Sequence, residues 1–398
     1  MKTSLHRRQF ITTSALTLAG YAAMGAGLKR FAADAPLRVG LIGCGSRGGG
    51  IASVMKDLPQ LELAACCDII EKNLQNGMKS AAKNAKAYSD YRRLLEDKRI
   101  EAVIIATPLH LHHSMAVDAI SAGKHVYLEK TMTYDIPQAL DLVQKVNASG
   151  RILQVGHQYR YYALYHKVAE VIAKGWLGKV TQFECQYNRN ANWRRPVADP
   201  SQERLVNWRM YKEYSGGLVA ELCAHQIDIV NWLVNAHPEK VTGFGGIDFW
   251  KDGRETYDNV RLLYEYPGGV KASVTSLLMN EYKGYSMRIL GSKATIEIQR
   301  EKAFLYSEAG KKQLGTVDGV TGATVEAWTH GDGVLLAFQD DRKDPTAHAL
   351  LGFATSVQQR KQPASNVQTG RDAAIAVHMG NAAMETGQVQ LWKPEYSA

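Results

Sequence analysis

The chain has 398 residues, of which 45% are apolar and 22% are charged. These proportions are ordinary for a globular protein and exclude a disordered or fibrous chain, and the length favours two domains. The formal net charge is +9, but five basic residues precede the first acidic residue, Asp34, and without them the excess of basic residues falls to four. The charge therefore gives no support for nucleic-acid binding, and we expect no nucleic-acid partner.

The first 33 residues carry the features of an export signal. Residues 7–11 read R-R-Q-F-I, which fits the twin-arginine pattern, and an uncharged, mildly apolar run follows over Thr12–Leu28. This run is too short and too weakly apolar for a membrane span. We expect residues 1–33 to be a signal peptide for the twin-arginine export machinery and the protein to be periplasmic. A flexible basic tail is the alternative interpretation.

Leu37–Leu58 reads as a strand, a glycine-rich turn and a helix. Gly43, Gly45 and Gly48 have the G-x-G-x-x-G spacing of a dinucleotide-binding turn. In such a turn the first glycine allows a tight bend, the second lets backbone approach a pyrophosphate, and the third lets helix and strand pack closely. The N–H groups at the start of the helix then face the phosphates. The predicted cofactor contacts here are Gly43, Gly45, Ser46, Arg47 and Gly48.

A carboxylate stands where this motif needs one. Leu61–Cys67 reads as the second strand and ends at Asp68, twenty residues beyond Gly48. A carboxylate there accepts hydrogen bonds from the adenosine ribose and repels a 2′-phosphate, so NAD is favoured over NADP. The alternative is an ordinary strand–helix turn with an aspartate after the second strand.

Alternating strands and helices continue to residue 155. This alternation is typical of a doubly wound parallel sheet, whose ligands bind beyond the carboxyl ends of the strands. We predict an α/β fold with an N-terminal NAD-binding Rossmann domain over residues 36–155. Further strands are predicted over residues 85–88, 101–107, 125–128 and 151–155. The predicted cofactor contacts at the strand ends are Thr107, Pro108, His112, Glu129 and Lys130.

The pattern changes from residue 156, where strand-like runs dominate. They predict a C-terminal α+β domain over residues 156–390, with an open, largely antiparallel sheet that binds substrate and forms oligomers. A helix over Gly217–Leu233 interrupts the strands, and terminal helices are predicted near 347–358 and 370–384. We expect the uncovered face of the sheet to pack against another subunit in a homodimer or homotetramer.

Cysteine and histidine do not form a metal signature. Adjacent and i+2 histidines at His110, His112 and His113 rarely converge on one ion, so we predict no metal there. The cysteines lack paired spacing and are predicted to be core thiols. They are Cys44, Cys66, Cys67, Cys185 and Cys223.

Two segments carry candidate catalytic groups. Lys130 follows a strand beside the expected nicotinamide, where desolvation and the positive charge of oxidised NAD would lower its pKa. In the predicted second-domain helix, i, i+4 and i+7 spacing places Glu221, His225 and Asp228 on one face. A histidine flanked by carboxylates is suited to general-base catalysis. A metal site or a structural histidine remains an alternative for these three residues.

Two aromatic and polar segments are candidate substrate contacts. Residues 159–162 follow the sixth strand, and residues 187–194 leave the first strand of the second sheet. Aromatic rings beside planar polar groups suit a sugar or polyol, and a solvated loop is the alternative. The predicted substrate contacts are Arg160, Tyr162, Tyr187, Trp193, Arg194 and Asp228.

Together these residues resemble the Gfo/Idh/MocA oxidoreductase family across nearly all of residues 36–390. The matching motifs are Gly43-Cys-Gly45-Ser-Arg-Gly48, Asp68, Thr107-Pro108-x-x-x-His112, Glu129-Lys130, Gly156-x-x-x-Arg160 and Glu221-x-x-x-His225. The resemblance implies NAD(P)-dependent chemistry on sugars or polyols, with Lys130 and His225 as the catalytic pair. Thr131 stands where the family usually has proline, and Glu221 where it usually has aspartate.

Three hypotheses follow from the residues and the resemblance. The first is an exported NAD-dependent dehydrogenase that oxidises a secondary hydroxyl of a sugar or glycoside, at C3 in our hypothesis. Since the twin-arginine machinery carries folded proteins, its NAD would be loaded before export, held tightly and recycled by a second substrate or a redox partner. The second is a glycosidase of the family 109 type that oxidises its substrate transiently. The third is a sugar-binding or regulatory protein without catalysis.

Overall fold

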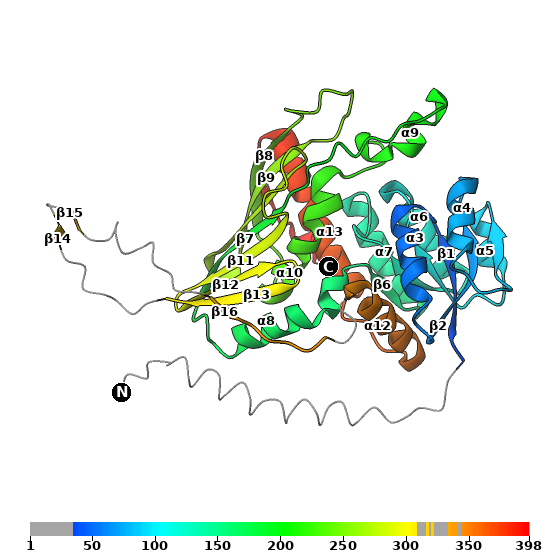
Figure 1. Ribbon diagram of the computed structural model, residues 1–398, viewed down its shortest axis with the longest axis horizontal. Coiled ribbons are helices and arrows are strands. Elements are labelled where there is room, and N and C mark those ends of the chain that lie inside the picture. The colour runs from blue at the N-terminus through cyan, green and yellow to red at the C-terminus, as the bar shows by residue number, and fades with distance from the viewer. Residues whose placement is uncertain (1–34, 309–315, 318–319, 322–332, 341–343, 398) are drawn as a thin grey trace. The chain divides into compact units, whose positions relative to one another are not determined.

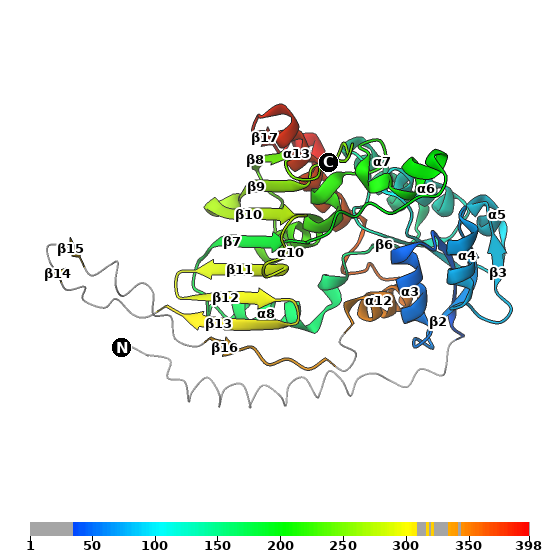
Figure 2. The ribbon, with the colours of Figure 1, turned by 45° about the horizontal axis from the view of Figure 1, so that its top comes forward.

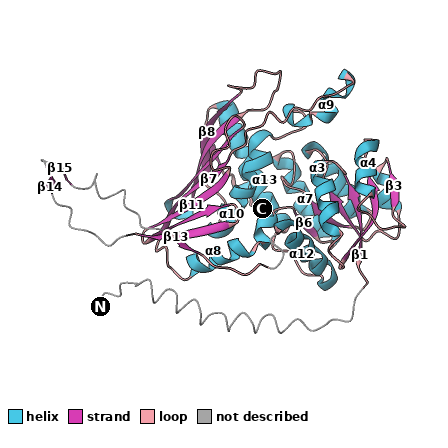
Figure 3. Ribbon diagram, viewed as in Figure 1, coloured by secondary structure: helices cyan, strands magenta, loops and turns pink. Residues whose placement is uncertain are grey.

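The computed structural model describes residues 35–308, 316–317, 320–321, 333–340 and 344–397. The predicted signal peptide lies outside these residues. Leu37–Ala398 form one compact unit with two large sheets, visible edge-on in Figure 1 and by element type in Figure 3. The predicted fold class is confirmed: a parallel Rossmann sheet is followed by a mixed, largely antiparallel sheet.

The first sheet has six parallel strands in the order β3-β2-β1-β4-β5-β6. Its central strands are buried on both faces, as their continuous apolar runs predict. The strands are β1 (Leu37–Ile42), β2 (Leu61–Cys67), β3 (Lys86–Tyr88), β4 (Ala102–Ile105), β5 (His125–Leu128) and β6 (Leu153–Val155). The helices are α3 (Ser46–Met55), α4 (Glu71–Met78), α5 (Tyr91–Glu96), α6 (His112–Ser121) and α7 (Ile136–Ser149). Asp135 caps α7 by accepting from Gln138 N at 2.8 Å.

The second sheet has the order β16-β13-β12-β11-β7-β10-β9-β8-β17, in which only β7 and β10 pair in parallel. Figure 2 shows this sheet face-on. Its strands are β7 (Val180–Tyr187), β8 (Lys240–Gly246), β9 (Asn259–Tyr266), β10 (Val270–Leu277), β11 (Tyr285–Gly291), β12 (Ala294–Gln299), β13 (Lys302–Ser307), β16 (Val334–Leu335) and β17 (Gln390–Leu391). A separate pair is formed by β14 (Thr316–Val317) and β15 (Val320–Thr321).

Helices cover one face of the second sheet and connect it to the first. Alternate residues of its strands are buried against α10 (Ala224–Val234) and α13 (Val367–Thr386). Helix α13 also packs on α7, so the last long helix of the chain joins both sheets (Figure 1). The remaining helices are α8 (Ala163–Ala173), α9 (Glu203–Val206) and α12 (Pro345–Gln359).

The opposite face of the second sheet carries exposed apolar side chains. Phe244 on β8 is 84% exposed, Leu263 on β9 is 47% exposed, and Leu391 on β17 is 61% exposed. These three residues define an apolar outer face, the face that we predicted to pack against another subunit.

The five cysteines are buried and form no disulfide, so the prediction of core thiols is confirmed. Among the described residues, no group of three histidine, cysteine or acidic side chains is arranged to bind a metal ion. None of the helices in the described ranges is both long and apolar enough to cross a lipid bilayer.

Candidate active site

The turn between β1 and α3 has the geometry that its glycine spacing predicts. Gly43 has a φ of +90°, and a Cβ there would lie 2.7 Å from the carbonyl oxygen of Ala106. A Cβ on Gly48 would lie 1.8 Å from the carbonyl oxygen of Gly43, so only glycine permits this packing. Beyond its chain neighbours, a Cβ on Gly45 would meet nothing closer than 3.9 Å. The start of α3 at Ser46 is therefore open to a pyrophosphate.

Arg47 extends from this turn across the sheet. Its Nε donates to Glu129 Oε1 at 2.8 Å, and its Nη1 donates to Thr346 Oγ1 at 3.3 Å. Glu129 is 5% exposed, packs on Gly156 and pairs with Arg47, and its contact with the dinucleotide stays a prediction. Arg47 Nη2 is buried and has no hydrogen-bond partner among the described residues. A guanidinium donor therefore remains for a pyrophosphate oxygen, which fits the predicted cofactor.

Asp68 follows β2 and is held by backbone groups. Cys44 N donates to its Oδ2 at 2.7 Å, and Ile70 N donates to its Oδ1 at 2.8 Å. An ionised carboxylate has about four acceptor positions. Acceptor capacity therefore remains for the hydroxyls of a ribose, and the half-buried position suits the predicted role.

His112 connects the ends of two neighbouring strands. Its Nδ1 lies 2.8 Å from the carbonyl oxygen of Thr131, and its Nε2 lies 3.1 Å from that of Thr107. Burial lowers the pKa of this imidazole. Both ring nitrogens thus face the backbone that follows β4 and β5, which differs from the direct cofactor contact that we expected. Pro108 follows Thr107 in the chain and precedes the short 3₁₀ turn Leu109–Leu111.

Lys130 follows β5 and contacts the second domain. Its Nζ donates to the carbonyl oxygens of Ala220 at 3.2 Å and Glu221 at 2.8 Å. Thr131 Oγ1 also donates to Ala220 O, at 3.1 Å, and the Lys130–Thr131 peptide bond is cis. Burial lowers the pKa of the Lys130 amine, although the charges of Glu221 and Glu129 oppose this effect. A neutral amine has two N–H bonds for these two carbonyls, and its lone pair is left to accept a proton.

The carbonyl groups that hold Lys130 belong to a π-helical turn, Val219–Cys223, which precedes α10. Since a π-turn takes more residues than an α-turn, the α-helical spacing of Glu221 and His225 that we predicted does not apply. The Glu221 carboxylate instead accepts from Arg209 Nε at 2.7 Å. Burial opposes the ionisation of Glu221, but the charges of Arg209 and Lys130 outweigh it and lower the pKa. Glu221 is thus paired with Arg209, and its flanking of His225 stays a prediction.

Asp228 and Arg160 form a buried ion pair. Arg160 Nε lies 2.9 and 2.8 Å from the two carboxylate oxygens of Asp228, and the residues are only 7% and 1% exposed. His157 Nδ1 lies 3.4 Å from Asp228 Oδ1. The pair joins α10 to the segment that follows β6. Both charged groups thus pair with each other, and the substrate contacts that we expected from them stay predictions.

His225 lies among aromatic rings beside Lys130. Its ring centroid is 5.1 Å from that of Tyr159 and 6.3 Å from that of His157. Its Nδ1 is buried and accepts or donates no hydrogen bond within the described part of the chain. Burial and then the charge of Lys130 lower the pKa of His225 well below its ordinary value. The imidazole is therefore neutral near pH 7 and shares one environment with the amine.

The two predicted tyrosine contacts have different surroundings. Tyr162 is 3% exposed, and its ring packs edge-on against Phe338 with centroids 5.9 Å apart. It is a core residue, which corrects its expected contact with substrate. Tyr187 is half-buried at the end of β7, and its hydroxyl accepts from Arg189 Nη2 at 2.8 Å. Tyr187 thus lies at the carboxyl end of β7, an inner strand of the second sheet.

Trp193 and Arg194 belong to a loop with its own ion pairs. Arg194 pairs with Glu203 and, at 3.3 Å, with Asp252. Trp193 is half-buried, with a φ of +69°. The guanidinium of Arg194 therefore stabilises the loop, where we had expected it to contact substrate.

Three residues of the site were not among the individually predicted site residues: His157, Tyr159 and Arg209. His157 follows β6 at the carboxyl edge of the first sheet, so the strand-end argument that identified Lys130 would also have identified it. Tyr159 was noted only as part of an aromatic segment. Arg209 lies in the short 3₁₀ turn Trp208–Met210, and no local pattern connects it to Glu221.

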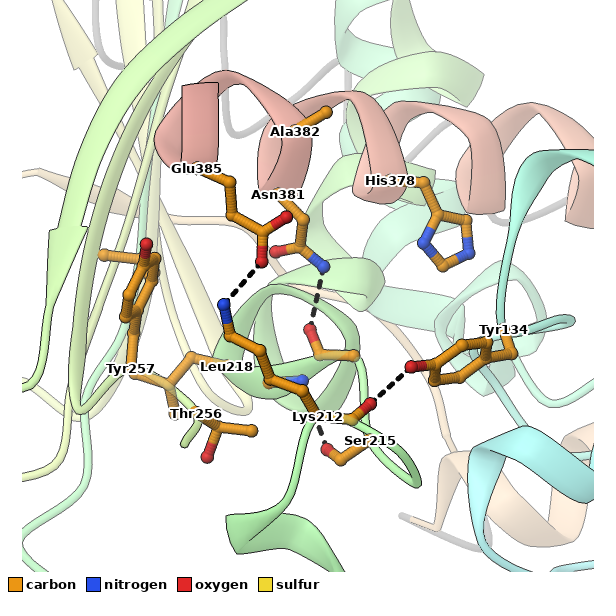
Figure 4. Close-up of a pocket in the computed structure, with 13 residues that line it drawn as sticks. Tyr134, Lys212, Ser215, Leu218, Thr256, Tyr257, His378, Asn381, Ala382 and Glu385 are labelled. Atoms are coloured by element: carbon orange, nitrogen blue, oxygen red, sulfur yellow. Dashed lines mark hydrogen bonds and ion pairs between the residues drawn. The ribbon is translucent and has the colours of Figure 1, made fainter. Parts of the chain in front are cut away.

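A cavity of about 390 Å³ lies next to the residues that precede the π-turn, and Figure 4 shows its lining. Asn381 Nδ2 on α13 donates to the carbonyl oxygen of Gly216 at 2.9 Å. Lys212 Nζ pairs with Glu385 at 2.7 Å, and the Tyr134 hydroxyl donates to the carbonyl oxygen of Lys212. The contacts of Asn381 and Glu385 attach α13 to the segment that leads into the π-helical turn Val219–Cys223.

Comparison with known proteins identifies the family. Residues 37–157 match the model of the oxidoreductase family with an NAD-binding Rossmann fold, and residues 165–297 match the Gfo/Idh/MocA C-terminal domain. The chain belongs to the Gfo/Idh/MocA family of oxidoreductases. The family predicted from the motifs is thereby confirmed, and the NAD-binding character of the first domain with it.

Individual relatives are distant in sequence. The chain is 24% identical to the myo-inositol 2-dehydrogenase of Thermotoga maritima over 358 residues, which cover 88% of this chain and 96% of the relative. It is 28% identical over 200 residues to an inositol 2-dehydrogenase/D-chiro-inositol 3-dehydrogenase of Lactiplantibacillus plantarum, a match that spans 50% of this chain and 52% of the relative. A levoglucosan dehydrogenase in complex with NADH and levoglucosan shares the fold, with a TM-score of 0.71, 18% identity, and coverage of 89% of this chain and 99% of the other.

Proposed function

We propose that this protein is an NAD-dependent dehydrogenase that oxidises a secondary hydroxyl of a sugar, polyol or glycoside, at C3 in the glycoside case. The observation that carries the proposal is the pairing of a desolvated Lys130 amine with a neutral His225 at the carboxyl edge of the Rossmann sheet. The names of the inositol and levoglucosan dehydrogenases point to the same class of substrate.

The residues divide the work as follows. NAD, when bound, supplies the acceptor for the hydride from the substrate carbon. Lys130 is the proton acceptor, because burial lowers its pKa toward the working range while the two carbonyls of the π-turn orient it. His225, whose neutral imidazole burial favours, keeps the hydroxyl in place through a hydrogen bond. Asp68 binds the adenosine ribose and selects NAD over NADP, which the change Asp68→Ser would relax.

The test uses purified protein. Denaturation releases the bound nucleotide for identification, and glycosides and inositols are then screened for keto products and for absorbance of the reduced nicotinamide. A keto product together with reduced nucleotide is the expected result. Release of an aglycone without net reduction would instead identify the glycosidase alternative. Binding of a sugar with no turnover would identify a binding protein.

Export and assembly belong to the same proposal. Replacing Arg7 and Arg8 with lysine should keep the protein in the cytoplasm, if the twin-arginine machinery carries it to the periplasm with its NAD and a redox partner recycles that NAD there. The apolar outer face supports a homodimer or homotetramer, so Phe244→Asp should lower the mass measured by light scattering.

A further inference from the structure

A second cavity, of about 360 Å³, lies at the edge of the C-terminal sheet where β7 and β12 end and β11 begins. The cross-strand pairs Tyr187–Tyr285 and Ser286–Gln299 lie at these strand ends. Figure 2 shows these strand ends on the side of the sheet nearest α10. The cavity is lined by Asn188, Arg189, Glu281, Lys283, Tyr285 and Arg300.

One ring separates this cavity from the environment of His225. Tyr285 contributes to the cavity wall, and its ring centroid lies 5.4 Å from that of Tyr159, which in turn lies 5.1 Å from His225. The charges of Arg189 and Arg300 are close enough to oppose the strong effect of burial, which raises the pKa of the Tyr159 phenol. These cations therefore lie on the far side of Tyr159 from His225, close enough for their charge to act on that ring.

The cations of the cavity are not matched by acids. Lys283 is paired with Glu297 at 3.1 Å, but neither Arg189 nor Arg300 has an acidic partner among the described residues. Arg189 donates to the Tyr187 hydroxyl and stacks over that ring at 4.9 Å. Arg300 Nη2 lies against Gly284, 3.9 Å from where a Cβ would be. Glu281 is the single acid in the lining.

Asn188 adds an unused polar group. The residue is 6% exposed, lines the cavity, and has a buried Oδ1 without a hydrogen-bond partner in the described ranges. A buried amide oxygen without a hydrogen-bond donor is rare in a folded protein and needs a reason. Two guanidinium groups and an amide suit a planar carboxylate with neighbouring hydroxyls, because guanidinium forks pair with carboxylates in two-point fashion.

We propose that this cavity is a subsite for a carboxylate of the substrate, so that the enzyme prefers acidic sugars such as glycosiduronates to their neutral counterparts. The inference rests on the proposed function, since it places the acid group of the same molecule whose hydroxyl lies at Lys130 and His225. A neutral sugar would offer these two arginines no opposite charge, whereas a carboxylate can pair with them.

The experiment compares matched sugars on the holoenzyme. Methyl glucopyranoside, galactopyranoside and mannopyranoside are each paired with the corresponding methyl glycosiduronate, and binding is measured by calorimetry at low and high salt. At least one uronate should bind roughly tenfold more tightly than its neutral partner, since a hydrogen bond to a charged group contributes about that much. Its advantage should shrink as salt increases, because the arginines are near the surface.

Variants assign the effect to the cavity. Arg300→Gln and Arg189→Gln should each weaken uronate binding roughly tenfold, with a much smaller effect on the neutral sugar, and Arg300→Lys should recover part of the loss. Arg38→Gln is the control, because Arg38 is an exposed arginine on β1 of the first sheet and lies outside both cavities and outside the apolar outer face. It should change neither affinity. Thermal unfolding of each variant checks that the fold is kept.

The outcomes are distinguishable. Equal binding of uronates and neutral sugars, or unchanged uronate binding by Arg300→Gln, overturns the subsite. Tighter binding of a glucose 6-sulfate than of any uronate, lost in Arg300→Gln, overturns the carboxylate assignment and identifies a sulfate site. Arginine-dependent uronate binding without any reduction of the nucleotide supports the subsite while the proposed dehydrogenase function fails.

Discussion

The two ends of strand β5 carry lysines with nearly the same local chemistry. Lys124 precedes the strand and donates to the carbonyl oxygens of Asp97 and Ile100 at 2.9 and 2.7 Å. Lys130 follows the strand and donates to those of Ala220 and Glu221. Burial lowers the pKa of both amines. What differs is the edge of the sheet: only the carboxyl end faces the glycine turn and the second domain. Burial and hydrogen bonding alone therefore do not identify a catalytic lysine.

The largest expected effect comes from removing each amine in turn. Lys130→Met should lower kcat about 10²–10⁴-fold, the usual contribution of a proton-transfer group. Lys124→Met should leave kcat within about twofold, because no substrate reaches the amino edge. Each variant removes two hydrogen bonds to backbone carbonyls, so both should lose about 1–3 kcal/mol of stability. Steady-state kinetics with urea unfolding checks both, and equal turnover in the two variants would remove Lys130 from the mechanism.

A second pair of substitutions tests the glycine turn at the same edge. Gly48→Ala places a Cβ 1.8 Å from the carbonyl oxygen of Gly43, so backbone must move and the protein should lose its bound nucleotide. Gly50→Ala, two residues later in α3, meets nothing within 4 Å and should stabilise the protein by about 0.5–1 kcal/mol. Nucleotide released on denaturation and unfolding free energies are the measurements. A Gly48→Ala protein with full nucleotide content would contradict the close packing described here.

The difference between these regions also explains how far the sequence could be interpreted. The turn at Gly43–Gly48 was predictable because two of its constraints lie within six residues: the positive φ of Gly43 and the close approach of Gly48 to the carbonyl oxygen of Gly43. Helix capping by Asp135 is local in the same way. The orientation of Glu221 was not predictable, because the π-turn that redirects it depends on Lys130 and Thr131, about 90 residues earlier in the chain.

Long-range ion pairs account for two further differences from the sequence-based expectations. Arg160 and Asp228 are 68 residues apart, and Arg47 and Glu129 are 82 residues apart. Each of these residues has a charge that suits a ligand, and the sequence does not show that another side chain of the same protein neutralises it. The types of these residues and their positions in the chain indicate where the site lies. They do not indicate which charged groups remain free to bind a ligand.

Buried histidines around the site predict a loss of stability in acid. Burial lowers the pKa values of His112, His157 and His225, so the unfolded chain binds more protons than the folded protein below about pH 6.5. Stability is therefore complete above that pH and falls as pH decreases, with each neutral histidine adding up to about 1.4 kcal/mol per pH unit. Urea unfolding at several pH values measures the slope. His157→Gln should make it shallower, and an unchanged slope would show that His157 is protonated in the folded protein.

The smallest expected effect concerns the charges around Lys130 and has opposite signs for two variants. Glu221 raises the pKa of the Lys130 amine against the larger effect of burial, and Arg209 lowers that pKa in the same direction as burial. Glu221→Gln should therefore lower that pKa and move the acid limb of the kcat profile to lower pH, because more of the amine is neutral there. Arg209→Gln should move the same limb to higher pH. Since Lys124 lies at the other end of β5, Lys124→Met should leave the limb in place. If Glu221→Gln and Arg209→Gln shift the profile in the same direction, the limb does not report the protonation of Lys130, and the base must be sought elsewhere at the carboxyl edge.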